Sequence, residues 1–249
     1  MPRRQGDSLL AAADRTLIEA VRDGLRAAAD PAKAPQMQAY MKSAMPYYGV
    51  QHPPAQRIFR DAIAAHPLDG FEAWRDTTLA LWREATHREE RYGALALAEH
   101  RRYRAHRTRA AFPMYEEFVV TGAWWDLVDE TAGNLLDELH QQDPEWMAAR
   151  MREWSTAPEM WKRRASIICQ LRHKQTTDLR LLYDCIEPNL GDREFFIRKA
   201  IGWALRQYAW TDPDEVVRYV TANAERLSPL SKREALKNVL KSGRINAIP

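Results

Sequence analysis

Apolar residues recur at helical spacing from one end of the chain to the other. Near the N-terminus they fall every three or four positions until Asp30-Pro31 ends the run, at Leu9, Leu10, Ala13, Leu17, Ile18, Val21 and Leu25. A period close to 3.6 indicates an amphipathic helix. No segment alternates apolar and polar residues with the β-branched enrichment typical of a strand. The pattern therefore predicts an all-α chain.

Start and stop signals divide this pattern into separate helices. Asp69 can N-cap one helix, residues 88–102 form another, and Pro113 lies near the start of a short one. Thr121 or Gly122 opens a helix over residues 124–139. Asp143-Pro144 supplies an N-cap and a first-turn proline for the next helix. Further helices are predicted at residues 157–173, 177–186, 193–209, 212–222 and 229–241.

A weak internal repeat runs through the helices. Three segments share an acid, an aromatic residue two positions later and an alanine six positions later, and they begin at Glu90, Glu159 and Glu194. The last two copies are 35 residues apart, and the first lies 69 residues before the second. Such periods are typical of an α-solenoid of the armadillo, HEAT or TPR kind, in which stacking supplies the core. We expect one such domain over residues 1–249, with about 241–249 as a loose tail.

Composition narrows the picture only slightly. The 249 residues are 45% hydrophobic and include only ten glycines, so the chain can bury a core. A net charge of +3 is compatible with a polyanionic partner but does not identify one. The N-terminus is no apolar signal sequence and no apolar run approaches the roughly 20 residues that cross a bilayer, so we expect a cytoplasmic protein without membrane contact.

Neither a metal nor a cofactor is indicated. Cys169 and Cys185 lie in apolar helical patterns and are expected to be reduced and buried, and there is no CxxC or His/Cys cluster. Glycine-rich nucleotide loops, the nucleophile-elbow motif and HExxH are also missing. The chemistry must therefore come from carboxylates, arginines and aromatic residues.

The most informative tract is Trp-Trp-Asp-Leu-Val-Asp at residues 124–129. Residues four apart share a helix face, so Trp125 and Asp129 can point to one place. An aromatic wall beside a carboxylate suits a planar cation. The alternative is a pair of core tryptophans beside an exposed acid. The hexapeptide alone leaves both open; taken together with Arg164 and Trp203 far away in the sequence, it assigns Trp124 to packing and Asp126 to the helix dipole.

Two further tracts carry basic residues beside tryptophans. In residues 161–165 an arginine pair normally faces solvent, but one member can turn inward. In residues 199–206, Gly202 beside Trp203 indicates either close approach of a bulky group or tight helix packing. Four further cations could line one face of the solenoid and contact DNA phosphates: Arg172, Lys174, Lys199 and Arg206. The alternative is that they form an ordinary solvated surface.

At these tracts the chain resembles the AlkD-type DNA alkylation repair glycosylases, which are built from HEAT-like repeats. The similarity covers nearly the whole chain, weakens at about residues 55–115, and is carried by motifs at residues 37–42, 124–129, 163–175, 194–208 and 230–235. It implies an α-solenoid of HEAT-like repeats whose concave face binds double-stranded DNA.

The resemblance also implies residue roles. Asp129 resembles the catalytic carboxylate, Trp125 and Trp203 the aromatic walls at the lesion, and Tyr40 a third aromatic contact. Arg164 is similar to the arginine beside the acid and the DNA backbone. The family removes cationic alkylpurines such as 3-methyladenine and 7-methylguanine while the lesion stays stacked in the duplex.

We therefore expect a monomeric, monofunctional DNA glycosylase, because no lysine in the Trp–Asp tract could form a Schiff base. Two alternatives stay open. One is a non-catalytic relative that binds damaged or branched DNA. The other is a protein-binding scaffold, for which no steep salt dependence of DNA binding is expected.

Overall fold

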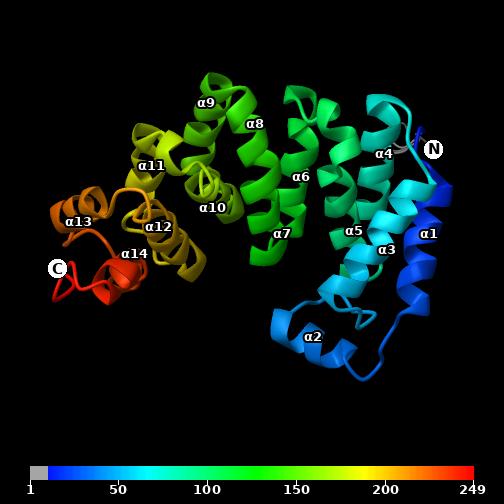
Figure 1. Ribbon diagram of the computed structural model, residues 1–249, viewed down its shortest axis with the longest axis horizontal. Helices are drawn as coiled ribbons and strands as arrows, with labels where there is room; N and C mark the ends of the chain where they lie inside the picture. The colour runs from blue at the N-terminus through cyan, green and yellow to red at the C-terminus, as the bar shows by residue number, and fades with distance from the viewer. Residues whose placement is uncertain (1–10) are drawn as a thin grey trace. The chain divides into compact units, whose positions relative to one another are not determined.

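The computed structural model describes residues 11–249, and every regular element in that range is helical (Figure 1). Leu9 and Leu10 of the first apolar run lie outside the described residues. The chain divides into two compact units, Met1–Met114 and Tyr115–Pro249. The predicted all-α fold class is confirmed, and within each unit successive helices stack in the manner of an α-solenoid.

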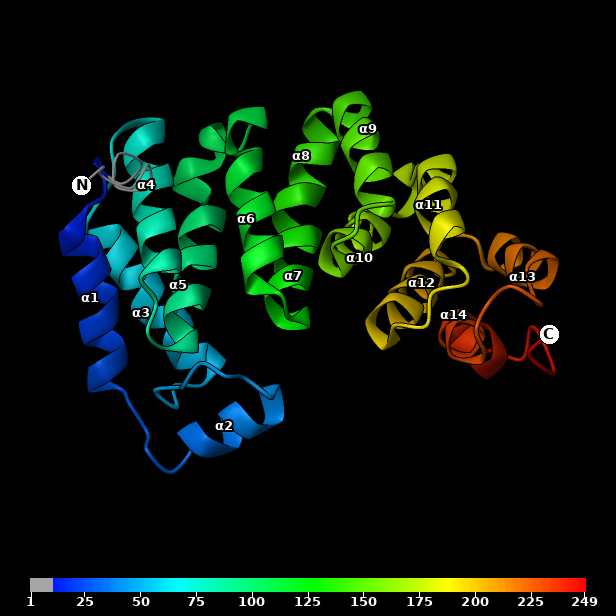
Figure 2. The same ribbon diagram turned by 180° about the vertical axis from the view of Figure 1, so that it is seen from behind.

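The first unit is built on four packed helices and one that stands apart. Helix α1 packs on α3, α4 and α5, and its predicted apolar face, which includes Leu17 and Val21, is buried. Figures 1 and 2 show α2 set apart, near the start of α3. The helices are α1 (Arg15–Ala27), α2 (Ala34–Met41), α3 (His52–Ala65), α4 (Gly70–Arg83) and α5 (Arg88–Glu99).

Two buried glutamates at the start of α5 hold the connection between α2 and α3. Glu89 accepts the backbone N–H groups of Tyr48 at 3.1 Å, Gly49 at 2.9 Å and Val50 at 3.1 Å. Gly49 has φ +87°, and a Cβ there would lie 2.2 Å from the Asp30 carbonyl oxygen, so only glycine fits. The carboxylate thus fixes the chain that leads away from α2.

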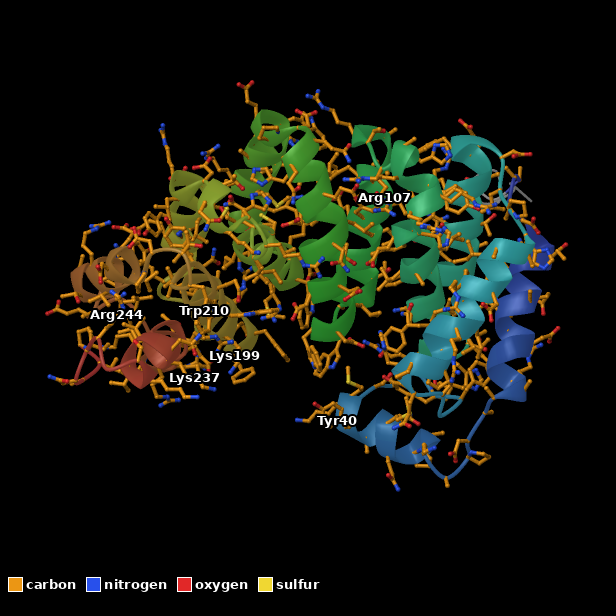
Figure 3. All side chains as sticks on the ribbon, in the orientation of Figure 1. Tyr40, Arg107, Lys199, Trp210, Lys237 and Arg244 are labelled. Carbon is orange, nitrogen blue, oxygen red and sulfur yellow. The ribbon has the colours of Figure 1, made fainter. Side chains whose placement is uncertain are left out.

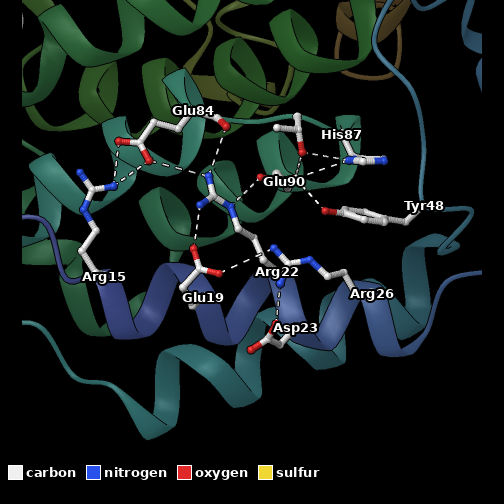
Figure 4. Close-up of polar contacts among 10 residues, drawn as sticks. Arg15, Glu19, Arg22, Asp23, Arg26, Tyr48, Glu84, His87 and Glu90 are labelled. Carbon is white, nitrogen blue, oxygen red and sulfur yellow. Dashed lines mark hydrogen bonds and ion pairs between the residues drawn. The ribbon is translucent and has the colours of Figure 1, made fainter.

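Glu90 is the centre of a second polar network (Figure 4). Its carboxylate is fully buried and accepts hydrogen bonds from Arg22 Nε at 2.9 Å, Tyr48 Oη at 2.9 Å and Thr86 Oγ1 at 2.8 Å. Burial raises the pKa of Glu90, but these hydrogen bonds outweigh it, and the pKa lies below its usual value. The network joins α1, α5 and the connection after α2.

The second unit is a row of helix pairs. Helix α9 packs on α10 and α11, α10 on α12, and α12 on α14 (Figure 2). A π-helical turn, Thr131–Leu136, joins α7 to α8. The helices are α6 (Phe112–Gly122, which begins at the end of the first unit), α7 (Trp125–Glu130), α8 (Asp137–Gln142), α9 (Pro144–Ser155), α10 (Met160–Ile168), α11 (Leu179–Ile186), α12 (Phe195–Tyr208), α13 (Pro213–Ala222) and α14 (Pro229–Lys241).

The repeat period shows in the helix starts. The N-caps of α7, α10, α12 and α14 are Trp124, Glu159, Glu194 and Ser228, at spacings of 35, 35 and 34 residues. Two copies of the acid–aromatic–alanine pattern therefore occupy equivalent positions. The copy at Glu90 is out of register, because that residue lies three positions after the N-cap of α5.

Several predicted boundaries were wrong. Thr121 and Gly122 end α6 instead of opening the next helix, and Ala123 adopts a left-handed φ of 40° between the two. Helix α5 ends at Glu99 and continues as a 3-10 turn, Arg101–His106. Helix α10 covers only part of residues 157–173. In each case the apolar spacing continues through a turn that breaks the helical hydrogen bonds.

The predictions for the two cysteines and for two N-caps are confirmed. Cys169 and Cys185 are free and buried. Asp69 and Asp143 occupy N-cap positions, although neither side chain makes a capping hydrogen bond. Within residues 11–249, no helix is long and apolar enough to span a bilayer.

Candidate functional site

An aspartate and an arginine from two helices of the second unit form a bidentate ion pair. Arg164 of α10 donates from Nε to Asp129 Oδ1 and from Nη2 to Asp129 Oδ2, each at 2.7 Å. Its Nη1 donates to the main-chain carbonyl of Phe196 on α12 at 2.6 Å. Helices α7, α10 and α12, whose N-caps are spaced 35 residues apart, thus meet at the guanidinium of Arg164.

Burial sets the electrostatics of this pair. The side chain of Asp129 is 14% exposed and that of Arg164 only 4%. Burial raises the pKa of Asp129 and Arg164 lowers it, and the carboxyl pKa remains above its usual value. A carboxylate has about four lone-pair sites and Arg164 uses two of them, so a water or a ligand can still approach Asp129.

The two arginines of residues 161–165 point in different directions, in keeping with the prediction that one of them can turn inward. Arg164 turns inward to Asp129. Arg163 instead pairs with Asp192 at 3.0 Å and donates to the carbonyl of Ala157 at 2.8 Å. Arg163 therefore ties the end of the preceding turn to the start of α12, and it makes no contact with Asp129.

The tryptophan pair divides in the same way. Trp124 packs edge-on against Phe196, with ring centroids 5.3 Å apart, and against Trp161 at 6.1 Å. Its assignment to packing is confirmed. Trp125 lies half-buried one turn before Asp129 on α7, and Asp126 is the acid of the first turn, as predicted.

Trp203 lies half-buried on α12 beside the glycine that the sequence singled out. A Cβ at Gly202 would lie 2.4 Å from Glu234 Cβ and 2.8 Å from the Ser231 carbonyl oxygen of α14. Tight helix packing therefore explains Gly202. The same glutamate pairs with Lys199 at 2.8 Å and with Arg206 at 2.5 Å.

Among the predicted residues of the second unit, no hydrogen bond joins Arg172, Lys174, Lys199 or Arg206 to the ion pair. Arg172 and Lys174 are exposed in the turn after α10, where Lys174 has a left-handed φ of 53°. Tyr40 belongs to the first unit, on α2, and is 78% exposed (Figure 3). The second unit thus brings Asp129 and Arg164 into direct contact, with Phe196 as their third partner.

Arg107, in the arginine-rich stretch at residues 101–109, has a structural role. Arg107, labelled in Figure 3, is buried. Its guanidinium donates to the carbonyls of Ala98, at 3.1 Å, and Glu99. These carbonyls end α5 and have no helical partner. Arg107 is therefore a C-terminal cap of α5.

Sequence reasoning missed two contributors, Phe196 and Glu234. Phe196 acts through its main-chain carbonyl, which any residue carries, so only its position could have revealed it. Glu234 lies within the motif at residues 230–235, but its pairing with two cations of α12 depends on how the helices pack. Among residues 11–249, no group of three or more His, Cys, Asp or Glu side chains is placed to hold a metal ion.

Two comparisons with known proteins found DNA alkylation repair enzymes. The family model described as DNA alkylation repair enzyme matches residues 21–239. A solved structure from Enterococcus faecalis, described as a predicted DNA alkylation repair enzyme, is similar with a TM-score of 0.76 and 28% sequence identity, over 86% of this chain and 97% of that one. Among proteins with curated descriptions, none matches the chain.

Proposed function

The chain belongs to the DNA alkylation repair enzyme family, and from that premise we propose that it is a DNA glycosylase for cationic alkylpurines. The bond broken is the N-glycosidic bond of N3- or N7-alkylated purines, such as 3-methyladenine and 7-methylguanine, in duplex DNA. The observation that carries the proposal is the Asp129 carboxylate, only 14% exposed, held by two hydrogen bonds from Arg164 with Trp125 one helical turn away.

The reaction needs one anion and no acid. Alkylation makes the purine cationic, so the C1′–N bond can break with both electrons going to the base, which leaves neutral. Positive charge then develops on the deoxyribose, and a fixed carboxylate stabilises it. Water adds to C1′, and its proton passes to Asp129 or to solvent. A neutral glycoside would require a second carboxyl group to protonate its leaving group.

Arg164 fits the role of a positioning residue that also meets DNA. Its three hydrogen bonds fix the plane of the Asp129 carboxylate, so little reorganisation is needed when charge develops. A guanidinium has five N–H groups, so two lie outside these bonds; because the side chain is only 4% exposed, the proposed contact with the DNA backbone requires these two groups to become accessible when DNA binds. Trp125, Trp203 and Tyr40 would supply aromatic faces that attract the cationic base and sugar.

Several finer features are part of the same proposal. We propose a monofunctional, cytoplasmic and monomeric enzyme without a cofactor. The lesion would remain stacked in the duplex, and the Lys and Arg side chains at positions 172, 174, 199 and 206 would contact the backbone.

The direct test is release of 7-methylguanine from methylated DNA by the wild type and by Asp129→Asn. We expect the variant to release base about 10²–10³-fold more slowly, the loss typical when a preorganised electrostatic group is removed. Glu130→Gln is the matched control, since Glu130 is the next residue on the same helix and its exposed carboxylate accepts a hydrogen bond from Asn134 at 2.9 Å. Equal rates for wild type and Asp129→Asn would reject the assignment. DNA binding without release by the wild type would instead favour a non-catalytic DNA-binding protein.

A further inference from the structure

Helix α14 carries a row of exposed cations that the proposed site does not use. Arg233, Lys237 and Lys241 are exposed and lie four residues apart, so they share one face of the helix. Lys237 and, beyond the helix, Arg244 are labelled in Figure 3. At a rise of about 1.5 Å per residue the three helical cations extend over roughly 12 Å.

This row has no compensating acid on its own helix. The only carboxylate of α14 is Glu234, which pairs with Lys199 and Arg206 of α12. Lys232 points elsewhere and donates to the Ala224 carbonyl at 3.1 Å. The positive charge of Arg233, Lys237 and Lys241 is therefore presented to solvent, where a polyanion can neutralise it.

The row is also next to the proposed site. Helix α14 packs directly on α12, and Gly202 lets the two backbones approach closely beside Trp203. The cations of α12 expected from the sequence to bind phosphates, Lys199 and Arg206, already share Glu234. The three exposed cations of α14, in contrast, would not have to break an ion pair with Glu234 in order to bind DNA.

We propose that the exposed face of α14 (Arg233, Lys237 and Lys241) binds the phosphate backbone of the duplex flanking the lesion. This inference rests on the proposed function and extends its DNA footprint by one helix. Each phosphate neutralised by a cation releases counterions, so the surface contributes affinity that is independent of sequence and falls as salt rises.

The test is the salt dependence of binding to an unmodified duplex. We compare the wild type with a triple variant, Arg233→Gln, Lys237→Gln and Lys241→Gln. If each cation meets one phosphate, the slope of log K against log salt becomes shallower by about 0.9 per side chain. At enzyme concentrations below saturation, base release from a lesion duplex should slow by the factor by which the affinity falls, because these side chains contribute binding and do not touch the reacting atoms.

A second triple variant controls for net charge. Arg150→Gln, Arg152→Gln and Arg180→Gln remove the same formal charge from α9 and α11, and we expect the wild-type slope. An unchanged slope in the α14 variant, or an equal change in both variants, would overturn the role of α14 while leaving excision intact. Loss of excision in the wild type itself would instead overturn the proposed glycosylase.

Discussion

At the scale of the residue, the central feature is a carboxylate that is buried yet paired. Removing Asp129 from water disfavours its charge, and Arg164 restores part of what burial costs. The sequence could predict this pair only through the spacing of Trp125 and Asp129 and through a family resemblance. It could not predict Phe196 as a third partner, because a main-chain carbonyl leaves no mark in a sequence.

The raised pKa of Asp129 predicts a pH profile. The proposed reaction needs the ionised carboxylate, so the release rate should fall as the pH drops through the pKa. Because that pKa lies above the usual aspartate value, the fall should begin at a higher pH than for an exposed aspartate. Arg164→Gln removes the partner that lowers the pKa and should move the fall to still higher pH. Single-turnover rates against pH measure both, and a profile unchanged by Arg164→Gln would contradict this account.

At the scale of the element, helix existence was more predictable than helix ends. The periodic apolar positions predicted the bounds of α12, α13 and α14 to within about two residues, because each helix buries one apolar face. The ends of α5 and α6 depended on a 3-10 turn and on the left-handed Ala123, and neither changes the apolar spacing. The sequence also did not predict the row of exposed cations on α14. Those cations lack a compensating acid because Glu234 pairs with cations of α12, and that pairing depends on how the two helices pack.

The contact between α12 and α14 gives a prediction about stability. Gly202→Ala should destabilise the protein by about 1–3 kcal/mol, because its Cβ would meet Glu234 Cβ at 2.4 Å and the Ser231 backbone at 2.8 Å. That cost should exceed the gain of about 1 kcal/mol in helix propensity. Denaturant unfolding measures the difference. In Gly133→Ala, the control, the new Cβ would meet no group within 4 Å apart from its chain neighbours and the backbone of its own helix, and we expect no loss. A neutral Gly202→Ala would show that the helices separate easily.

At the scale of the whole molecule, a repeated helix start organises the second unit, and a buried polar network holds part of the first. N-caps spaced 35, 35 and 34 residues apart organise the second unit, and the acid–aromatic–alanine pattern recovered two of these starts. The chain divides into two compact units, and one domain over residues 1–249 stays a prediction. The network around Glu90 in the first unit was not predicted, because its members come from α1, α5 and a loop.

That network should make stability depend on pH. The pKa of Glu90 is lower in the folded state than in the unfolded chain, so its contribution is present above the unfolded pKa and is lost as the pH falls through the folded pKa. Glu90→Gln leaves Arg22 without its buried partner and should cost about 3 kcal/mol at neutral pH, with a smaller deficit in acid. Chemical denaturation of both proteins across the acidic range gives the comparison. A deficit that is constant with pH would argue against the ionised network.

The central claim is that Asp129 acts on the transition state and not on DNA binding. The most direct measurement is the single-turnover rate of base release from a duplex with one 7-methylguanine, with enzyme in saturating excess, alongside the dissociation constant of the same duplex. We predict that Asp129→Asn lowers the rate by about 10²–10³-fold while the dissociation constant changes little. A variant that binds weakly but releases base at the wild-type rate once saturated would contradict the account.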